Sequence, residues 1–237
     1  MSRVIEANKN RIESVTEIAL VDIVGFSKLP AEAQWLTAVL INAKLEEMTG
    51  LASSLSALNL EELILGFVPT GDGFFVILHP SNNGYGLLFG ASLRTTLLLA
   101  SSANGNLYSG VRVATHLGKV FSFVDVTGRK NFVGPGMNEC ARLLGVKTNQ
   151  APSGFLVDEN FLFVSRPSVE AFEAHQKNNA NYWCKLGYRK TEWLTVVDKH
   201  GQEHVGAFVE ISRNAAWNPP KPADYKARMM ARFSQYK

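Results

Sequence analysis

The sequence has little of what marks several protein classes. Its 237 residues include only two cysteines, Cys140 and Cys184, which form neither a disulfide framework nor a metal-ligand spacing. The net charge is only +3 and the basic residues are scattered until the C-terminal tail, so we expect no nucleic-acid partner. Arg94 interrupts the best candidate for a membrane span, and no apolar stretch of signal-peptide type begins the chain. We therefore expect a cytoplasmic protein.

The composition is that of a globular protein. The sequence is 46% hydrophobic and 19% charged, which is typical of a folded domain with a substantial core. Its length fits one domain with appendages. We predict an N-terminal segment over residues 1–15, a domain over residues 16–212 and a basic tail over residues 213–237.

The stretch Val-Asp-Ile-Val-Gly-Phe-Ser at residues 21–27 organises the predicted fold. An apolar, β-branched run over 18–24 predicts a strand that carries Asp22 near its end. Gly25 allows a tight turn, and Pro30 suits the first turn of a helix. Apolar residues at alternating steps of three and four then predict a helix over residues 31–57.

A second carboxylate lies about 50 residues further on. Asp72 stands between two glycines and two apolar runs, 63–68 and 74–78, a pattern typical of a β-hairpin with the acid at its tip. A helix over 85–101 should follow, ended by Asn104 and Gly105. We then predict a strand pair over 108–116 and 119–126, broken near Gly118, and an exposed loop over 127–130.

A short helix is predicted from Gly136 onward. Its buried face should carry Met137, Cys140, Ala141 and Leu144. Asn138 and Arg142 are four residues apart and therefore share a different face. Further on, we predict a helix over 169–176 and a hairpin of 192–197 with 205–211. The order strand, helix, hairpin, helix, strand predicts an α+β fold, a ferredoxin-like βαββαβ sandwich with extra C-terminal strands and helices.

The two aspartates suggest metal chemistry. Two carboxylates held side by side repel each other unless a cation lies between them. Carboxylate oxygens suit Mg²⁺ or Mn²⁺, and two such ions can clamp both oxygens of a phosphoryl displacement. The alternative is that Asp22 caps a helix and Asp72 merely favours a turn.

Four motifs together resemble the class III nucleotidyl cyclases, which convert a nucleoside triphosphate into a 3′,5′-cyclic monophosphate and pyrophosphate. They are Asp-Ile-Val-Gly-Phe-Ser at 22–27, Gly-Asp-Gly-Phe at 71–74, Arg-Val-Ala-Thr-His-Leu-Gly at 112–118, and Asn-Glu-Cys-Ala-Arg-Leu at 138–143, preceded by Gly134. Their order and spacing match over residues 15–150. Ala114 departs from the family, where a glycine is usual.

The resemblance implies a role for each matched residue. Asp22, Asp72 and the Ile23 carbonyl would hold two divalent cations, Mn²⁺ or Mg²⁺. Asn138 would orient the ribose, and Arg142 would stabilise charge on the α-phosphate and leaving group. The backbone amides that would cradle the triphosphate are those of Val24, Gly25, Phe26 and Ser27.

The resemblance also implies an assembly. The family forms head-to-tail homodimers in which one subunit supplies the metal ligands and the other supplies the asparagine and arginine. The family further uses a phosphate-binding lysine near the last hairpin, for which both Lys190 and Lys199 are candidates here.

The positions that read the base depart from the family's purine cyclases. Adenylyl cyclases use a lysine and an aspartate where this chain has Val68 and Asn131, and guanylyl cyclases use a glutamate and a cysteine. In this respect the chain resembles the pyrimidine cyclases of bacterial antiphage (Pycsar) systems. This implies a UTP cyclase in preference to a CTP cyclase, whose cyclic UMP or cyclic CMP activates a separate effector.

Three alternatives are less favoured. An adenylyl cyclase would have to recognise purine by other residues. A catalytically silent regulatory module would normally have lost an aspartate or the arginine, and this chain keeps both kinds of residue. A diguanylate cyclase would carry a Gly-Gly-(Asp/Glu)-Glu-Phe hairpin, which the sequence lacks.

Overall fold

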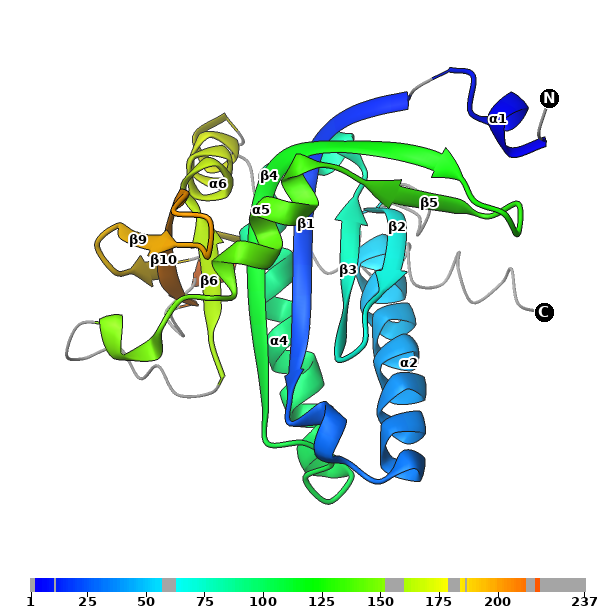
Figure 1. Cartoon of the computed structure of the whole chain (residues 1–237). Helices are drawn as coiled ribbons and strands as arrows, with labels where there is room; N and C mark the ends of the chain where they lie inside the picture. The colour runs from blue at the N-terminus through cyan, green and yellow to red at the C-terminus, as the bar shows by residue number, and fades with distance from the viewer. Residues whose placement is uncertain are drawn as a thin grey trace.

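The computed structural model describes residues 3–10, 12–56, 63–151, 160–178, 184–185, 187–211 and 216–217. One large mixed sheet dominates these residues, in the strand order β2-β3-β1-β4-β6-β10-β8, with β5 paired to β4 and β9 paired to β10 (Figure 1). The strands are β1 (Ile12–Val24), β2 (Ile64–Pro69), β3 (Gly73–Leu78), β4 (Gly110–Val124), β5 (Lys130–Val133), β6 (Leu162–Ser165), β7 (Cys184–Lys185), β8 (Tyr188–Lys190), β9 (Leu194–Val197), β10 (Glu203–Ile211) and β11 (Ala216–Trp217). The helices are α1 (Arg3–Ala7), α2 (Ala31–Ser56), α4 (Gly86–Ala103), α5 (Pro135–Leu143) and α6 (Arg166–Asn178).

The first half of the chain forms the predicted sandwich. β1, α2, β2, β3, α4 and β4 follow one another as βαββαβ, and the strand order β2-β3-β1-β4 is antiparallel throughout. The C-terminal part extends this sheet, because β6 pairs with β4 in parallel and β10 then pairs with β6. The predicted α+β class, with its C-terminal additions, is therefore confirmed.

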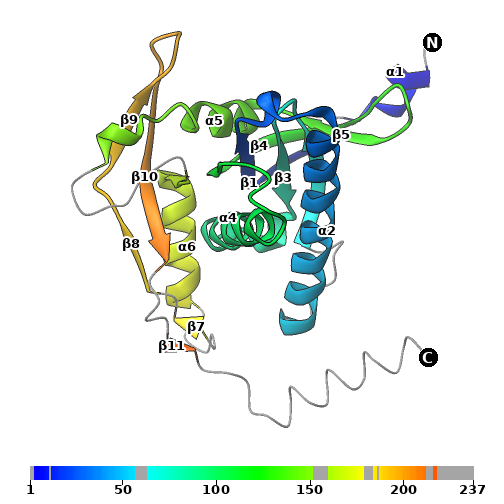
Figure 2. The ribbon, with the colours of Figure 1, turned by 90° about the horizontal axis from the view of Figure 1, so that it is seen from below.

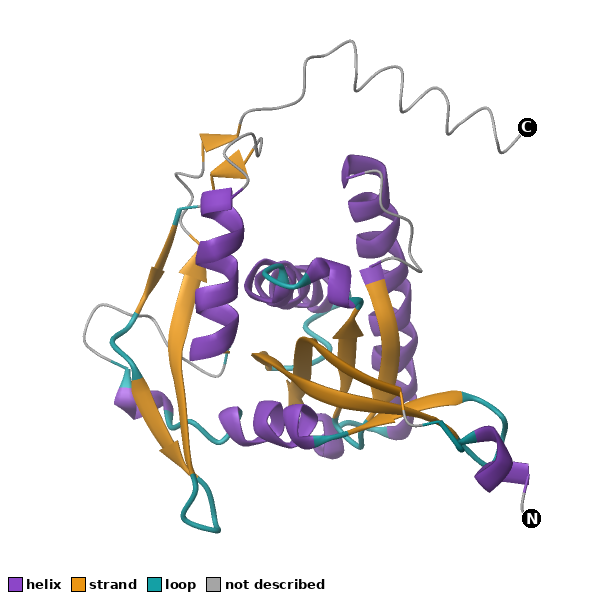
Figure 3. Cartoon of the chain, turned by 90° about the horizontal axis from the view of Figure 1, so that it is seen from above, coloured by secondary structure: helices purple, strands orange, loops and turns teal. Residues whose placement is uncertain are grey.

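Two hydrophobic cores lie on opposite faces of the sheet. Helices α2, α4 and α6 cover one face and α5 covers the other (Figures 2 and 3). Alternation along β1 divides its side chains between them: Val21 and Ile23 join the α2–α4 core, whereas Ile18 and Leu20 join the α5 core. Asp22 has the parity of Ile18 and Leu20, so it belongs to the α5 face.

Three local predictions were wrong. The break near Gly118 is absent, because β4 runs unbroken beside the long strand β1, and Gly118 pairs with Thr16. The predicted loop ends one residue early, since Lys130 already pairs with Val124 in β5. In α5, Leu143 is buried and Ala141 is exposed.

The structure describes only parts of the predicted N-terminal segment and C-terminal tail. The side chain of Asn8 bonds the backbone of Val124 through both its amide nitrogen and its oxygen, which ties the residues after α1 to the end of β4. Of the predicted tail, only Ala216 and Trp217 are described, as β11. The domain boundaries stay predictions.

Helix α4 has the length and composition of a membrane span despite Arg94, so the expectation that no segment would qualify was too strong. Half of this helix is buried inside the protein, as is usual for a core helix.

Candidate active site

The structure brings Asp22 and Asp72 together. Asp22 pairs with Gly73 across β1 and β3, and the Ile23 N–H donates to the Asp72 carbonyl oxygen at 2.9 Å. A side chain at Gly73 would place its Cβ 1.9 Å from the Val21 carbonyl oxygen, so the hairpin tip reaches this position only with glycine. The predicted juxtaposition of the two carboxylates at the strand end is thus present.

Arg112 forms the closest charged contact of this pair. It lies opposite Asp22 in the ladder of β1 and β4, with Nη2 2.5 Å and Nε 2.7 Å from Asp22 Oδ2. Arg112 stands in one of the four motifs, but no role for it was predicted from the sequence. The long antiparallel register of β1 with β4 was the missing information, because it alone places residue 112 opposite residue 22.

The environment of Asp22 disfavours its charged form. Burial raises the pKa of the Asp22 carboxyl, the hydrogen bond and charge of Arg112 lower it, and the neighbouring Asp72 raises it again, with a net rise. Burial and the charge of Asp72 therefore outweigh the stabilisation that Arg112 gives to the Asp22 carboxylate.

This donor set fits a divalent cation. Asp22 and Asp72 offer hard oxygens on the same strand end, and an added positive charge would relieve both their mutual repulsion and the desolvation of Asp22. Among the described residues no group of three or more His, Cys, Asp or Glu side chains forms a metal site, so a backbone oxygen such as that of Ile23 would have to complete the ligand set.

The turn after β1 has the shape of a phosphate cradle. Gly25 is in the left-handed conformation with φ 75°, and a short 3-10 helix, η1 (Phe26–Lys28), follows it. The N–H groups of Lys28 and Leu29 donate to the carbonyls of Gly25 and Phe26. The N–H groups of residues 25–27 come before the first of these bonds. N–H groups in the first turn of a helix have no partner within the helix, and such groups can bind anions.

The second predicted pair lies elsewhere in the same chain. Asn138 is exposed on α5, and Arg142 follows one turn later. α5 packs through Gly136 against Ile18 and Gly118. Further along α5, Cys140 Sγ lies 3.4 Å from the Ala114 carbonyl oxygen. Among the described residues, neither Asn138 nor Arg142 has a hydrogen bond or ion pair with Asp22 or Asp72 of its own chain.

The turn between β9 and β10 holds the guanidinium of Arg142. Its Nε lies 3.0 Å from Asp198 Oδ2, and its Nη1 donates to Gln202 Oε1 at 3.0 Å. His204 Nδ1 lies 2.7 Å from Glu139 Oε1, and His204 Nε2 lies 3.4 Å from Asp198 Oδ2. Helix α5 and the last hairpin are thus joined by polar contacts that were not predicted from the sequence.

Burial alone would raise the pKa of Asp198. The backbone hydrogen bonds from Gln202 and His200, the hydrogen bond of His204 and the charge of Arg142 outweigh it, and the pKa of the Asp198 carboxyl is lowered. Asp198 is consequently ionised at neutral pH, although only 7% of its side chain is exposed.

The two predicted base-reading positions lie on two strands that contact each other without being paired in the sheet. β2, which carries Val68, contacts β5, which carries Asn131. Val68 is partly buried against the α5 core, to which Phe132 also belongs. The Asn131 Oδ1 accepts the backbone N–H of Phe132 at 2.8 Å, which orients the carboxamide so that its NH₂ group is directed away from that bond.

The two candidate lysines differ in their surroundings. The Lys190 Nζ lies 4.3 Å from the centroid of the Trp193 ring, a cation–π contact. Lys199 is exposed in the same turn as Asp198 and Gln202, the two partners of Arg142.

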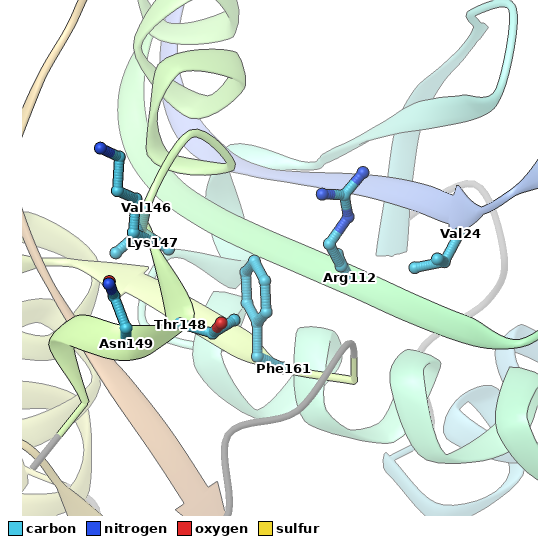
Figure 4. A pocket seen from close by; sticks show the side chains of 7 residues that line it. All are labelled: Val24, Arg112, Val146, Lys147, Thr148, Asn149 and Phe161. Atoms are coloured by element: carbon cyan, nitrogen blue, oxygen red, sulfur yellow. The ribbon is translucent and has the colours of Figure 1, made fainter.

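A cavity of about 520 Å³ lies beside Arg112 (Figure 4). Arg112 comes from β4 and Val24 from the end of β1, and the opposite side is formed by Phe161 with the residues after α5. The lining residues are Val24, Arg112, Val146, Lys147, Thr148, Asn149 and Phe161. Space for a ligand therefore adjoins the strand end that carries Asp22.

The sequence matches no protein-family profile and no curated protein. Solved structures are similar to it in fold. The guanylate cyclase domain of RhGC from Catenaria anguillulae, in complex with GTP, has a TM-score of 0.55 at 14% identity, over 85% of this chain and 100% of that one. The catalytic core of a rhodopsin-guanylyl cyclase with converted specificity, in complex with ATPalphaS, has a TM-score of 0.53 at 13% identity, over 85% of this chain and 99% of that one. The chain therefore has the fold of the class III nucleotidyl cyclase catalytic domains.

Proposed function

We propose that this protein is a nucleotidyl cyclase that converts a pyrimidine nucleoside triphosphate, UTP in preference to CTP, into its 3′,5′-cyclic monophosphate and pyrophosphate. The observation that carries the proposal is the pairing of Asp22 with Asp72 at the strand end of a cyclase fold. In the reaction, the ribose 3′-oxygen attacks the α-phosphorus, the bond to the β-phosphate breaks, and the 3′-hydroxyl proton is lost.

The residues divide this work between them. Asp22, Asp72 and the Ile23 carbonyl would hold two divalent cations, which activate the 3′-hydroxyl and neutralise the phosphates. The turn at residues 24–27 binds the triphosphate through its N–H groups. Arg112 lies beside the same carboxylate and supplies a cation toward phosphate oxygens.

The active site is shared in a homodimer. Within one chain Arg142 is held by the turn between β9 and β10, and no contact joins Asn138 or Arg142 to Asp22 or Asp72 among the described residues. A head-to-tail partner would bring its own Asn138 and Arg142 to these aspartates, to orient the ribose and to stabilise charge on the α-phosphate and the leaving group. Lys199 contacts phosphate in preference to Lys190, because it lies in the turn that holds Arg142 whereas Lys190 is engaged with Trp193.

The base preference rests on Val68 and Asn131. With its oxygen bonded to the Phe132 N–H, the Asn131 carboxamide is left mainly as a donor. Uracil presents an acceptor, O4, at the position where cytosine presents an amino donor, so the donor favours uracil. A base that leaves a buried polar group unpaired costs about 1–3 kcal/mol, which gives strong discrimination.

The wider role follows from this chemistry and from the antiphage pyrimidine cyclases that these positions resemble. The cyclic UMP or cyclic CMP made in the cytoplasm would act as a second messenger on a separate effector in antiphage defence.

The test is to incubate the purified protein and Mn²⁺ with UTP, CTP, ATP and GTP, singly and in competition, and to identify the products by mass spectrometry. We expect cyclic UMP to dominate, cyclic CMP to come next, and little cyclic AMP or cyclic GMP. Asn131→Ala should lower UTP turnover and the selectivity against CTP together. Mostly cyclic AMP under competition would replace the pyrimidine proposal with an adenylyl cyclase, and no pyrophosphate from any triphosphate would indicate a silent regulatory module.

A further inference from the structure

The turn between β9 and β10 makes more contacts with Arg142 than hairpin closure requires. Asp198 uses its two oxygens separately: Oδ1 accepts the N–H groups of His200 and Gln202 at 2.8 and 2.9 Å and so closes the turn, while Oδ2 faces Arg142 Nε at 3.0 Å. Gln202, at the far side of the turn, accepts from Arg142 Nη1. The turn therefore touches the guanidinium with two side chains at once.

These contacts leave part of the guanidinium available. Nε faces Asp198 and Nη1 bonds Gln202, whereas Nη2 donates no hydrogen bond within the described part of the chain. About a third of the Arg142 side chain is exposed. A guanidinium held at Nε and Nη1 can still donate from Nη2 to an anion.

The carboxylate itself is held in place. Asp198 is closed into the turn by two backbone N–H groups, and its Oδ2 also faces His204 Nε2 at 3.4 Å. His204 in turn contacts Glu139, the residue after Asn138. The hairpin is thus anchored to the helix at Glu139 and at Arg142 itself, which limits how far the guanidinium can move.

We propose that Asp198, with Gln202, is a positioning residue for the proposed cyclisation: it orients Arg142 so that Nη2 of the guanidinium meets the triphosphate across the dimer interface. The inference rests on the proposed function for its catalytic consequence. It differs from an autoinhibitory contact, in which Asp198 would have to release Arg142 before turnover.

The first experiment compares kinetics with UTP. Asp198→Asn keeps an oxygen to close the turn and removes the charge facing Arg142. We expect kcat to fall by roughly 10- to 100-fold with a KM change below about threefold, the size expected for a misplaced catalytic group. Gln202→Met, which leaves the Asp198 turn intact, should lower kcat less and serves as the second variant if Asp198→Asn fails to fold.

The matched control lies near the far end of β10, the strand that follows this turn. Glu210→Gln removes the carboxylate that accepts from Arg189 Nε at 2.6 Å, an exposed pair away from α5, and should leave kcat unchanged. The double variant, Arg142→Ala with Asp198→Asn, distinguishes positioning of Arg142 from a general structural role of Asp198. When Arg142 is already alanine, Asp198→Asn should have no further effect on the residual rate. A rise in kcat for Asp198→Asn would establish autoinhibition instead, and a wild-type kcat would overturn the proposal.

Subunit mixing assigns Asp198 to its half of the site. Asp198→Asn mixed with Asp72→Ala should recover activity, because one of the two sites in the mixed dimer is then intact. Mixed with Arg142→Ala it should not recover, because both changes affect the same half. Recovery in the second mixture would place Asp198 outside the arginine half and overturn the proposal.

A measurement without turnover separates this inference from the proposed function. In the wild-type protein the Arg142 Nε–H should give a resolved, slowly exchanging NMR signal, which Asp198→Asn should broaden or shift to the position of a free arginine. A wild-type protein that makes no cyclic nucleotide would refute the proposed function. An Arg142 signal that is unchanged in Asp198→Asn would refute the positioning by Asp198, whatever the activity.

Discussion

Two arginine–aspartate pairs with opposite roles lie in the two halves of the candidate site. In Arg112–Asp22 the proposed functional group is the carboxylate, and the arginine is its neighbour. In Arg142–Asp198 the proposed functional group is the arginine, and the carboxylate holds it. In the proposed site, the same kind of ion pair would compensate charge in one half and orient a guanidinium in the other.

The pairs differ in what surrounds each carboxylate. Asp22 has Asp72 beside it and its pKa is raised by burial, so its surroundings favour a further cation. Asp198 accepts two backbone N–H groups through Oδ1 and its pKa is lowered, so its surroundings already favour the charged form. An incomplete carboxylate, whose charge its surroundings do not balance, suits a metal site, and one whose charge is already balanced suits a positioning role.

The largest expected effect comes from removing the incomplete carboxylate. Asp22→Ala or Asp72→Ala should reduce turnover by about 10³-fold or more, because the charge of the reacting phosphates is no longer compensated. The fold should remain, since Asp72 is exposed and Asp22 is partly so. The measurement is pyrophosphate release with Mn²⁺, beside a thermal melt of each variant. Near-wild-type activity of either folded variant would refute the two-metal assignment.

The next test exchanges the cation and keeps its charge. Arg112→Lys should lower kcat by less than about tenfold, because a lysine still supplies a charge near Asp22. Arg142→Lys should lower kcat by about 100-fold, because an ammonium cannot contact Asp198, Gln202 and a phosphate with one planar group. Steady-state kinetics of the two variants under identical conditions makes the comparison. Equal losses would mean that both arginines act by geometry, and the distinction between the halves would fail.

How far the sequence predicts this site depends on how local each feature is. Asp22 and Asp72 were placed correctly because each stands in its own short strand-and-turn pattern, and the four motifs fixed their order. The contact of Arg112 with Asp22 was missed because it depends on the register of β1 with β4, strands 90 residues apart. The contacts of Arg142 with Asp198 and Gln202 depend on packing between α5 and a hairpin about 60 residues later, and no residue pattern encodes them.

The fold shows the same division. The ferredoxin-like order followed from alternating apolar periodicities. The predicted break at Gly118 is wrong because this glycine allows β4 and α5 to approach each other closely and does not interrupt the strand. A Cβ at this position would lie 2.9 Å from the Gly136 Cα and 2.5 Å from the His116 ring. Only the tertiary contact between β4 and α5 explains why residue 118 is glycine within a continuous strand.

A third carboxylate, Glu17, completes the comparison, because it has no arginine among its contacts in the described part of the chain. Its substitution should have the smallest effect on activity. It is fully buried on β1, where its oxygens accept from the Ser168 hydroxyl at 2.6 Å and the Gly84 N–H at 3.2 Å, at the starts of α6 and α4. Burial raises the pKa of Glu17, and the hydrogen bonds of Ser168, Gly84 and Gly86 only partly oppose it. We expect Glu17→Gln to leave kcat unchanged and to lower the free energy of unfolding by about 1–2 kcal/mol at pH 4.5, because the amide replaces one oxygen by an NH₂ group whose second hydrogen would face the N–H donors of the site. A protein with a buried acid whose folded pKa is raised loses stability as the pH rises from the unfolded pKa of 4.5 toward the folded pKa, and the glutamine variant does not.

The difference in the free energy of unfolding between wild type and Glu17→Gln, the stability gap, should therefore narrow above pH 4.5. Urea unfolding between pH 4 and 8 would detect this, with the exposed Glu170→Gln as the control. A gap that widens with rising pH would mean that Glu17 is stabilised as a carboxylate, as Asp198 is, and that burial is not what sets its pKa.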